Sequence, residues 1–356
     1  MSWPLSSHSP EERHRCPSPT ACPSPACPIP PGGPVLRWGV VGTGWIAERF
    51  VASVLRHTNH QVVAVGSRSE EGARRFTGRL GGEPLGSYAE LVAHPRVDVV
   101  YVASPHPQHV EHALLAIAAG KHVLVEKPIA IDAAGARRIA EAARAAGVFA
   151  MEAMWSLCLP KFRVINRLLD DGVLGDLTLV SADIGEYFPD RHRIHDPALA
   201  GGAMMDLGTY PLTLATWVLG APTEVAAQGV RGPTGTMAQT TMTLRHGEAQ
   251  SALHASALVE TPTVAAISGS DSWVSLDGPW YQPGSFTLHG RGGGQLRHLE
   301  AATAHDGLFW EALEVAHCLG EGRVESGIRP LDATIAALEA MDQVRAVTDD
   351  RLAGES

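Results

Sequence analysis

The sequence predicts an α/β protein in two parts, a doubly wound parallel sheet followed by an α+β domain with a large, mostly antiparallel sheet. The first part is predicted because an apolar run over residues 35–42 ends in a glycine-rich turn, after which apolar strands alternate with helical stretches. The second part is predicted because, after Met151, strand-like segments follow one another without helices between them. The length of 356 residues allows two cores, since a single core stops growing at roughly 250–300 residues.

Three segments are expected along the chain. Residues 1–34 are rich in proline and serine and hold too little apolar surface to offset their ordering entropy, which predicts a disordered tail. Residues 35–155 are expected to form the first domain, and residues 156–350 the second, whose last helix is expected to pack back on the first. The cysteines of the tail form no C-x-x-C pair, so no metal site is predicted there.

The expected elements are apolar strands and helices that end at glycine. In the first domain we expect strands over residues 35–42, 60–67, 96–104 and 121–127, and helices over residues 45–57, 108–120 and 133–147. In the second domain we expect helices over residues 161–169, 203–219, 307–319 and 331–347, and strands over residues 178–187, 223–230, 239–246, 248–256 and 263–270.

Composition argues against several classes of protein. The formal net charge is −10 and no run of lysine or arginine stands out, so no nucleic-acid partner is expected. No apolar run approaches the roughly 20 residues of a membrane helix, so no membrane partner is expected. The N-terminus has no positively charged start leading into an apolar stretch, and we therefore expect a cytoplasmic location.

A glycine-rich turn follows the first predicted strand. It has the spacing G-x-G-x-x-A and consists of Gly42, Thr43, Gly44, Trp45, Ile46 and Ala47. In such a turn Gly42 permits the tight bend, Gly44 lets the backbone approach a pyrophosphate, and Ala47 keeps helix and strand close. The unpaired N–H groups of the helix that begins here favour phosphates. Because the turn follows a strand and opens a helix, it predicts a Rossmann domain that binds a nicotinamide dinucleotide.

The second predicted strand ends where the adenosine ribose is expected. NAD enzymes usually place a carboxylate there, whereas this chain has Ser67 and Arg68. A guanidinium donates charge-assisted hydrogen bonds that suit a 2′-phosphate, so NADP(H) is the predicted cofactor. The alternative is that Arg68 is a solvated residue at a helix start and that the enzyme also takes NAD(H).

The triplet Glu126-Lys127-Pro128 ends the fourth predicted strand. Ligands of open α/β sheets bind beyond the carboxyl ends of the strands, so we expect Lys127 to point into the cofactor crevice. A lysine at a strand end is usually a surface charge, but one held by a following proline at this edge is a better catalytic candidate.

Three sequence motifs together resemble those of a known family. They are the G-x-G-x-x-A turn, the E-K-P triplet and GGAMMDLGTYP at residues 201–211. With them, the chain resembles the glucose–fructose oxidoreductase/inositol dehydrogenase (Gfo/Idh/MocA) family from Leu36 onward. Residues 104–109 and 151–155 and the tyrosine of Asp-x-Gly-x-Tyr-Pro look most like dimeric dihydrodiol dehydrogenases and D-xylose dehydrogenases. The resemblance implies that one face of the second sheet covers the active site and that the other forms a homodimer or homotetramer.

The resemblance also implies catalytic roles. It places Lys127 across the nicotinamide from Asp206 and Tyr210, which are four residues apart and so share one helix face. A neighbouring ammonium favours the phenolate of Tyr210, so Lys127 and Tyr210 are expected to carry the substrate hydroxyl proton while hydride goes to the nicotinamide. Asp206 is expected to orient them. The other cofactor contacts implied by the resemblance are Glu126, Ser104, His106 and His109.

Two further features concern the substrate. The resemblance implies that Trp155 lines the pocket as an aromatic wall. The loop Arg191–His195 is rich in hydrogen-bond donors and precedes the catalytic helix, so we expect it, and His195 in it, to bind substrate hydroxyls; the alternative is a solvated loop. The run of histidines at positions 106, 109 and 112 does not converge on one point of a helix, so no metal is expected.

The predicted function is that of an NADP-preferring oxidoreductase. It would transfer a hydride between the nicotinamide and a C–OH or C=O group of a carbohydrate-like substrate, either a sugar or a cyclic diol. It would be of the aldose 1-dehydrogenase or dihydrodiol dehydrogenase type. An NAD-dependent inositol-type dehydrogenase and a non-catalytic NAD(P)-binding sensor of the same fold are the alternatives. A sensor needs no proton relay, and the presence of both Lys127 and Tyr210 favours the enzyme.

Overall fold

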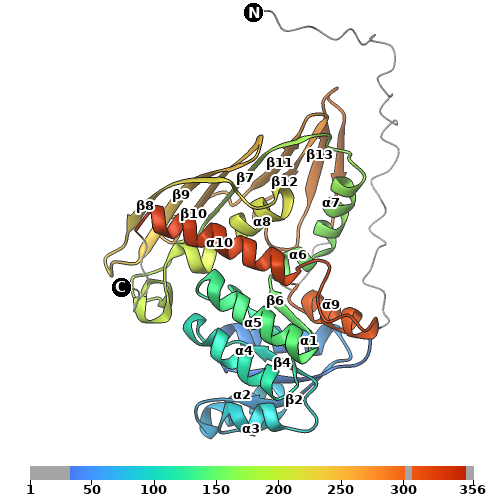
Figure 1. Cartoon of the computed structure of the whole chain (residues 1–356), viewed down its shortest axis with the longest axis vertical. Helices are drawn as coiled ribbons and strands as arrows, with labels where there is room; N and C mark the ends of the chain where they lie inside the picture. Colours follow the sequence, from blue (N-terminus) through green and yellow to red (C-terminus); the bar gives the residue numbers. More distant parts are fainter. Residues whose placement is uncertain (1–32, 301–306, 350–356) are drawn as a thin grey trace, which may run out of the picture.

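The computed structural model describes residues 33–300 and 307–349, so the tail predicted over residues 1–34 lies outside the described residues except for its last two. The described chain contains two sheets, one in each half of the molecule (Figure 1). The described chain begins beside a C-terminal helix, since Gly33 lies against Ala316. No helix of the described ranges has the length and apolar character needed to cross a membrane.

The first sheet has six parallel strands in the order β3-β2-β1-β4-β5-β6. Its strands are β1 (Arg37–Val41), β2 (Gln61–Gly66), β3 (Glu83–Leu85), β4 (Val99–Val102), β5 (His122–Glu126) and β6 (Ala150–Ala153). Its helices are α1 (Trp45–His57), α2 (Glu70–Leu80), α3 (Tyr88–Ala93), α4 (His109–Ala118) and α5 (Ala133–Ala146). The order reverses between β1 and β4, and the crevice at such a reversal is where ligands of this architecture bind.

An aromatic stack fixes α1 to the strands beneath it. The ring of Phe50 lies 3.8 Å from that of Tyr101 and 5.3 Å from that of Trp38, centroid to centroid, and all three side chains are fully buried. Aromatic pairs of this kind contribute about 0.5–1.5 kcal/mol beyond their burial. The stack therefore holds the start of α1, and with it the glycine turn, at the end of β1.

The second sheet has eight strands in the order β14-β13-β12-β11-β7-β10-β9-β8, and only β7 and β10 pair in parallel. Its strands are β7 (Leu177–Gly185), β8 (Glu224–Arg231), β9 (Met237–His246), β10 (Ala249–Ser256), β11 (Ala265–Gly269), β12 (Ser272–Leu276), β13 (Phe286–Gly290) and β14 (Gln295–His298). The mostly antiparallel sheet predicted from the sequence is confirmed.

The helices of the second half connect the two sheets (Figure 1). They are α6 (Trp155–Cys158), α7 (Pro160–Asp170), α8 (Thr209–Leu219), α9 (Phe309–Gly320) and α10 (Leu331–Val347). Helix α8 packs on β7 and β10, and α10 packs against α8 on one side and α5 of the first domain on the other. The last helix thus joins both halves.

The helix predicted over residues 203–219 is in fact two elements. A π-helical turn, Met204–Gly208, precedes α8. The turn packs tightly, since a Cβ on Gly208 would lie 2.8 Å from Sδ of Met204. A π turn changes the direction of the side chains that precede it, and such turns are frequent at functional sites. The four-residue spacing of Asp206 and Tyr210 therefore does not follow the regular α-helical register that the sequence suggested.

Candidate active site

The glycine turn lies at the carboxyl end of β1. Gly42 has a φ of +102°, its N–H donates to the carbonyl of Gly66 at 3.0 Å, and a Cβ there would lie 2.6 Å from the carbonyl oxygen of Ala103. Only glycine fits both conditions. A Cβ on Gly44, the N-cap of α1, would instead meet no atom within 4 Å. This open space in front of a helix N-terminus fits a dinucleotide pyrophosphate.

The remaining residues of the turn differ in exposure. Thr43 and Ile46 are half-buried, and Ala47 is fully buried where α1 approaches the sheet. The Trp45 side chain is 70% exposed, with the Arg49 guanidinium 5.4 Å from its ring centre. Trp45 therefore contributes its backbone to the turn and leaves its ring at the surface.

The end of β2 carries the two residues predicted to meet the adenosine ribose. Ser67 is buried and Arg68 is exposed at the approach to α2, whose N-cap is Ser69. Within residues 33–300 and 307–349 the Arg68 guanidinium has no ion-pair partner. A cation placed beside the crevice without an internal partner is suited to a ligand phosphate.

The turn after β4 holds the three residues Ser104, His106 and His109. His106 is buried, burial lowers its pKa to about 3, and its Nδ1 has no hydrogen-bond partner in the described chain. The neutral ring therefore offers one nitrogen to a ligand at the crevice. Ser104 instead pairs through its Oγ with Nδ1 of His112, 2.9 Å away.

His109 lies beneath this turn and is almost completely buried. Its Nδ1 lies 2.8 Å from the carbonyl oxygen of Pro128, and its Nε2 lies 2.7 Å from the carbonyl oxygen of Ser104. Burial lowers its pKa to about 4, so the ring is neutral and carries one N–H for two carbonyl oxygens. His109 thus connects the ends of β4 and β5 and supports the cofactor turn from below, with no nitrogen directed away from them.

Lys127 leaves the end of β5 and points toward the second domain. Its Nζ donates to the backbone carbonyl of Asp206 at 2.7 Å and lies 4.8 Å from the ring centre of Tyr210. Burial lowers the pKa of Lys127, while Asp206 and Glu126 act against that shift. Glu126 is itself buried, accepts hydrogen bonds from the Tyr101 hydroxyl and from the Lys127 N–H (3.1 Å), and has its pKa raised by burial.

Tyr210 lies at the start of α8, between Lys127 and two aromatic residues. Its hydroxyl accepts a hydrogen bond of 2.9 Å from Nε1 of Trp155, and its ring centre lies 4.7 Å from that of Tyr281. Burial raises the pKa of Tyr210 well above 10, and the Trp155 hydrogen bond offsets only part of that shift. The expected phenolate is therefore not favoured here: the desolvation of the charged form outweighs the nearby ammonium.

The Asp206 carboxylate contacts Arg193 and His106. Oδ1 lies 2.7 Å from Nη2 of Arg193 and 3.8 Å from Nε2 of His106. Burial alone would raise the pKa of Asp206, but His106, Arg193 and Lys127 together lower it, so the carboxylate is ionised. Asp206 therefore orients Lys127 through its backbone carbonyl and Arg193 through its side chain.

Several site residues escape sequence reasoning. The sequence predicts only that the loop Arg191–His195 is rich in donors; in the structure, Arg193 is the residue of this loop that reaches Asp206. The predicted substrate residue His195 is buried, with Nε2 3.2 Å from the carbonyl oxygen of Phe188 and Nδ1 without a partner in the described chain. Tyr281, whose hydroxyl donates to Glu186 beyond β7, completes an aromatic wall with Trp155. The one signal for this pair in the sequence is Glu186 near the end of the strand expected over residues 178–187; the structure ends that strand at Gly185.

A buried ion pair supports the site from behind. Glu152 of β6 accepts from the Arg329 guanidinium at 2.6 and 2.8 Å and, with its other oxygen, from the backbone N–H of Ile129 at 3.0 Å. Arg329 also lies 3.4 Å from the hydroxyl of Thr213. The pair therefore connects the chain just after Lys127 with α8, which carries Tyr210.

The described ranges contain no group of three or more His, Cys, Asp or Glu side chains arranged to hold a metal ion.

Comparison with known proteins assigns both halves of the chain. Residues 36–154 match the oxidoreductase family with an NAD-binding Rossmann fold, and residues 162–293 match the GFO/IDH/MocA C-terminal domain. The chain is 35% identical over 359 residues to D-xylose 1-dehydrogenase (NADP(+)) of Hypocrea jecorina, covering 86% of this chain and 90% of that protein. It is 33% identical to human trans-1,2-dihydrobenzene-1,2-diol dehydrogenase, covering 87% and 96% of the two chains.

A solved structure agrees with these sequence matches. KijD10, a 3-ketoreductase from Actinomadura kijaniata in complex with NADP and TDP-benzene, superposes with a TM-score of 0.78 at 27% identity, over 88% of this chain and 98% of its own. The predicted fold, the predicted nicotinamide cofactor and the predicted oxidoreductase class are thereby confirmed. This protein belongs to the Gfo/Idh/MocA family of oxidoreductases.

Proposed function

We propose that this protein is an NADP-preferring dehydrogenase that oxidises a C–OH group of a sugar or cyclic diol, or reduces the corresponding carbonyl. The observation that carries the proposal is the position of Lys127, whose Nζ lies 4.8 Å from the Tyr210 ring at the strand edge beside the glycine turn. A half-buried amine over the ring of a buried phenol supplies the two proton-handling groups that hydride transfer to or from an alcohol carbon requires.

Residues of the first domain would hold the cofactor. The backbone around Gly44 and the start of α1 suit the pyrophosphate, Arg68 suits a 2′-phosphate, and Nδ1 of His106 is available at the nicotinamide end of the crevice. When bound, the nicotinamide accepts or supplies the hydride. The D-xylose relative is named for NADP(+), which supports the cofactor preference drawn from Arg68.

The proton is handled by Lys127 and Tyr210. Because burial raises the pKa of Tyr210, the phenol keeps its proton; because burial lowers the pKa of Lys127, the amine loses its proton more easily than an exposed lysine. In carbonyl reduction Tyr210 donates its proton to the substrate oxygen, and Lys127 then restores it. In alcohol oxidation the same proton path runs in reverse, with the neutral amine as the final acceptor.

The substrate side combines aromatic surface with a carboxylate. Trp155 and Tyr281 meet edge to face at 6.2 Å and provide apolar walls, and Glu186 is half-buried beside them. Flat walls suit the C–H face of a sugar ring or a cyclic diol, and a carboxylate accepts hydrogen bonds from neighbouring hydroxyl groups. The two relatives named above act on D-xylose and on a dihydrobenzenediol, both neutral and hydroxylated.

We also infer self-association through the outer face of the second sheet. Exposed apolar side chains lie along it, among them Leu179 on β7, Val230 on β8 and Trp273 on β12, each between 40% and 51% exposed. Apolar residues repeated over one sheet face favour a protein–protein contact, here a homodimer or homotetramer. Sedimentation equilibrium tests it: a monomer at micromolar concentration would contradict this inference.

A substrate panel tests the proposed function. Aldoses, polyols including inositol, and trans-dihydrodiols are assayed with NADP+ and NAD+, with the absorbance of the reduced nicotinamide as the readout. We expect turnover of an aldose or a dihydrodiol, with NADP+ preferred. Turnover of inositol with NAD+ would favour the inositol-type alternative. Tight NADP(H) binding without turnover of any substrate would identify a sensor instead.

A further inference from the structure

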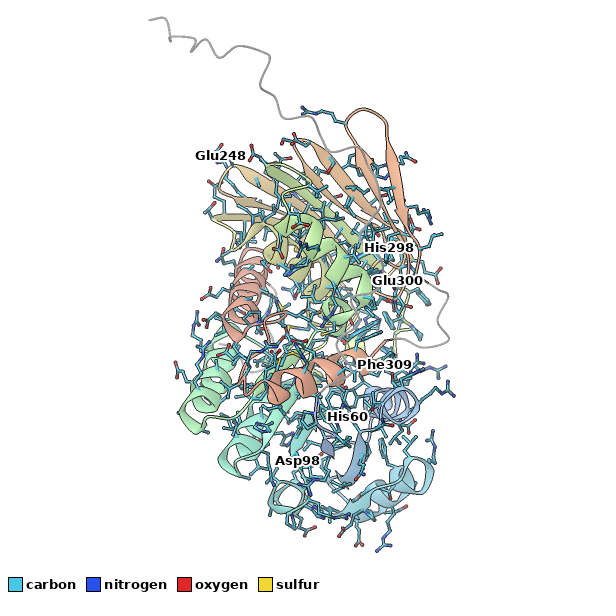
Figure 2. The ribbon with its side chains drawn as sticks, turned by 90° about the vertical axis from the view of Figure 1, so that its right-hand side faces the viewer. His60, Asp98, Glu248, His298, Glu300 and Phe309 are labelled. Atoms are coloured by element: carbon cyan, nitrogen blue, oxygen red, sulfur yellow. The ribbon has the colours of Figure 1, made fainter. Side chains whose placement is uncertain are left out.

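A second pocket lies away from the candidate active site. It encloses about 300 Å³ between α7, α8, α9 and residues 323–328, at the lower end of the range of small-molecule sites. Helices α7 and α9 lie on the right in Figure 1, the side that Figure 2 turns toward the viewer. None of the residues that line the pocket is among those that hold the predicted cofactor or the proton-transfer pair.

A half-buried guanidinium forms one wall of this pocket. Nη2 of Arg163 lies 3.2 Å from Oε2 of Glu314, a nearly fully buried carboxylate. The other oxygen of Glu314 accepts from the Ser326 hydroxyl at 2.7 Å and from Sγ of Cys318 at 3.3 Å. Both carboxylate oxygens are therefore engaged within the protein, and the ion pair fixes Arg163 in place.

The Nε–H of Arg163 is left without an acceptor. The atom is buried and has no hydrogen-bond partner in the described chain. An unsatisfied buried donor of this kind costs about 1–3 kcal/mol, and more for a charged group. Arg163 lines the cavity, so the guanidinium that holds this unsatisfied donor, next to a carboxylate that is already saturated, is the group that a ligand acceptor would meet.

The other walls supply a second guanidinium and an aromatic surface. Arg323 lies over Gly327, with Nη1 3.7 Å from the position of a Cβ there, and its Nε donates to the exposed Glu321 at 2.8 Å. Trp217 of α8 and Phe162 of α7 meet edge to face at 5.9 Å. The pocket thus offers charged donors on one side and a flat apolar wall on the other.

We propose that this pocket binds a small organic carboxylate with a flat apolar or sugar-like body. The two guanidinium groups accept a carboxylate through charge-assisted hydrogen bonds, and Trp217 covers a ring or the C–H face of a polyol. Neutral sugars lack the anionic group, and small inorganic anions lack the body that the aromatic wall would cover.

The walls of the pocket continue into the active site. Leu157 belongs to α6, whose first residue is Trp155, and Trp217 belongs to α8, which carries Tyr210. Ile328 directly precedes Arg329 of the buried ion pair. A bound carboxylate therefore contacts three segments that each hold a residue of the site, and it is expected to change KM or kcat without entering the crevice.

Calorimetric titration of the full chain with NADP+ bound tests the proposal. D-gluconate represents a polyol carboxylate, benzoate an aromatic carboxylate, and D-glucose and acetate lack one of the two required features. We expect one site for gluconate or benzoate, with affinity lowered about tenfold or more in Arg163→Lys, which removes the Nε donor and keeps the charge, and in Trp217→Leu. The matched control is Arg167→Lys, one turn along α7, where the guanidinium pairs with exposed Asp171 outside the pocket; its affinity should be unchanged.

Binding is read without turnover, so its result stands apart from the proposed function. Absence of binding by both carboxylates would overturn the proposal. Equal affinity in the wild type, Arg163→Lys and Trp217→Leu would overturn it as well. Loss of binding in Lys127→Met would place the carboxylate in the active site and contradict a second pocket.

Discussion

Replacing Arg329 by methionine removes one partner of the most deeply buried ion pair near the site. The side chains of Arg329 and Glu152 are 3% and 1% exposed, and two guanidinium nitrogens donate to the same carboxylate oxygen. Breaking such a pair from one side costs about 3–5 kcal/mol, because a charge stays buried without its partner. With an unfolding entropy of about 2.1 cal/mol/K per residue, each kcal/mol shifts the melting temperature of a 356-residue chain by about 1–1.5 °C, so the melting temperature should fall by about 4–7 °C.

The same substitution should lower activity more than stability alone explains. Glu152 also accepts from the N–H of Ile129, two residues beyond Lys127, and Arg329 reaches Thr213, one turn beyond Tyr210. Without the guanidinium, the segment after Lys127 and helix α8, which carries Tyr210, are no longer linked by this pair. Because small displacements of reacting groups cost much of the rate, kcat should fall about tenfold or more at a temperature where the variant is folded.

Thermal unfolding and steady-state kinetics, measured on the same samples, provide the assay. The matched control is Arg144→Met, whose guanidinium pairs with Glu325 and Asp332 at 42% exposure, where an ion pair is worth about 1 kcal/mol or less. The double variant of Arg329→Met with Glu152→Leu should recover part of the lost stability, since no charge then stays buried. An Arg329→Met protein as stable as Arg144→Met would refute this reasoning.

Four further predictions concern chemistry and specificity. Lys127→Met should lower kcat about 10²–10⁴-fold while calorimetry finds NADP(H) affinity within several-fold of the wild type. Because the neutral amine accepts the proton and burial lowers the pKa of Lys127, the oxidation rate should rise with pH through a pKa below that of an ordinary lysine; a pH–rate profile lacking this rise contradicts the assignment. Arg68→Glu should shift the ratio of kcat/KM for NADP+ and NAD+ toward NAD+ by tenfold or more, through repulsion of the 2′-phosphate. Glu186→Gln should raise KM for the sugar and leave KM for NADP+ unchanged, since the carboxylate lies on the substrate side.

The sequence predicted the first sheet well because its signals are local. The turn at Gly42 needs a positive φ and a close approach to Ala103. A glycine at that place in a strand–turn–helix pattern indicates both. The short strand β3 and strands β12–β14 were not predicted, since three to five residues carry too little periodicity. Strands β12–β14 pair as successive antiparallel hairpins, and β3 pairs with β2 across α2.

The candidate site was predictable only where a motif contains the residue. Lys127 and Tyr210 lie in such motifs, and in the structure the Lys127 amine lies over the Tyr210 ring. Tyr281 lies in a loop without a motif and reaches the site because β11 and β12 carry the chain back beside β7. The contact of Arg193 with Asp206 likewise depends on how a loop folds over the π turn, which no spacing in the sequence encodes.

The largest disagreement between sequence and structure concerns charge. The sequence places the ammonium of Lys127 next to the phenol of Tyr210, which predicts a phenolate. The sequence does not show how deeply Tyr210 is buried, and this burial raises its pKa and favours the neutral phenol. The hydrogen bond from Trp155 opposes this shift without cancelling it, and because the Tyr210 oxygen accepts from the indole, its own O–H hydrogen points elsewhere. Under the proposed function we therefore expect the neutral Tyr210 to donate to a substrate carbonyl oxygen in the reduction. Oxidation requires Lys127 to be neutral first, so the pH dependence of the two directions should differ in sign, rising with pH for alcohol oxidation and falling for carbonyl reduction.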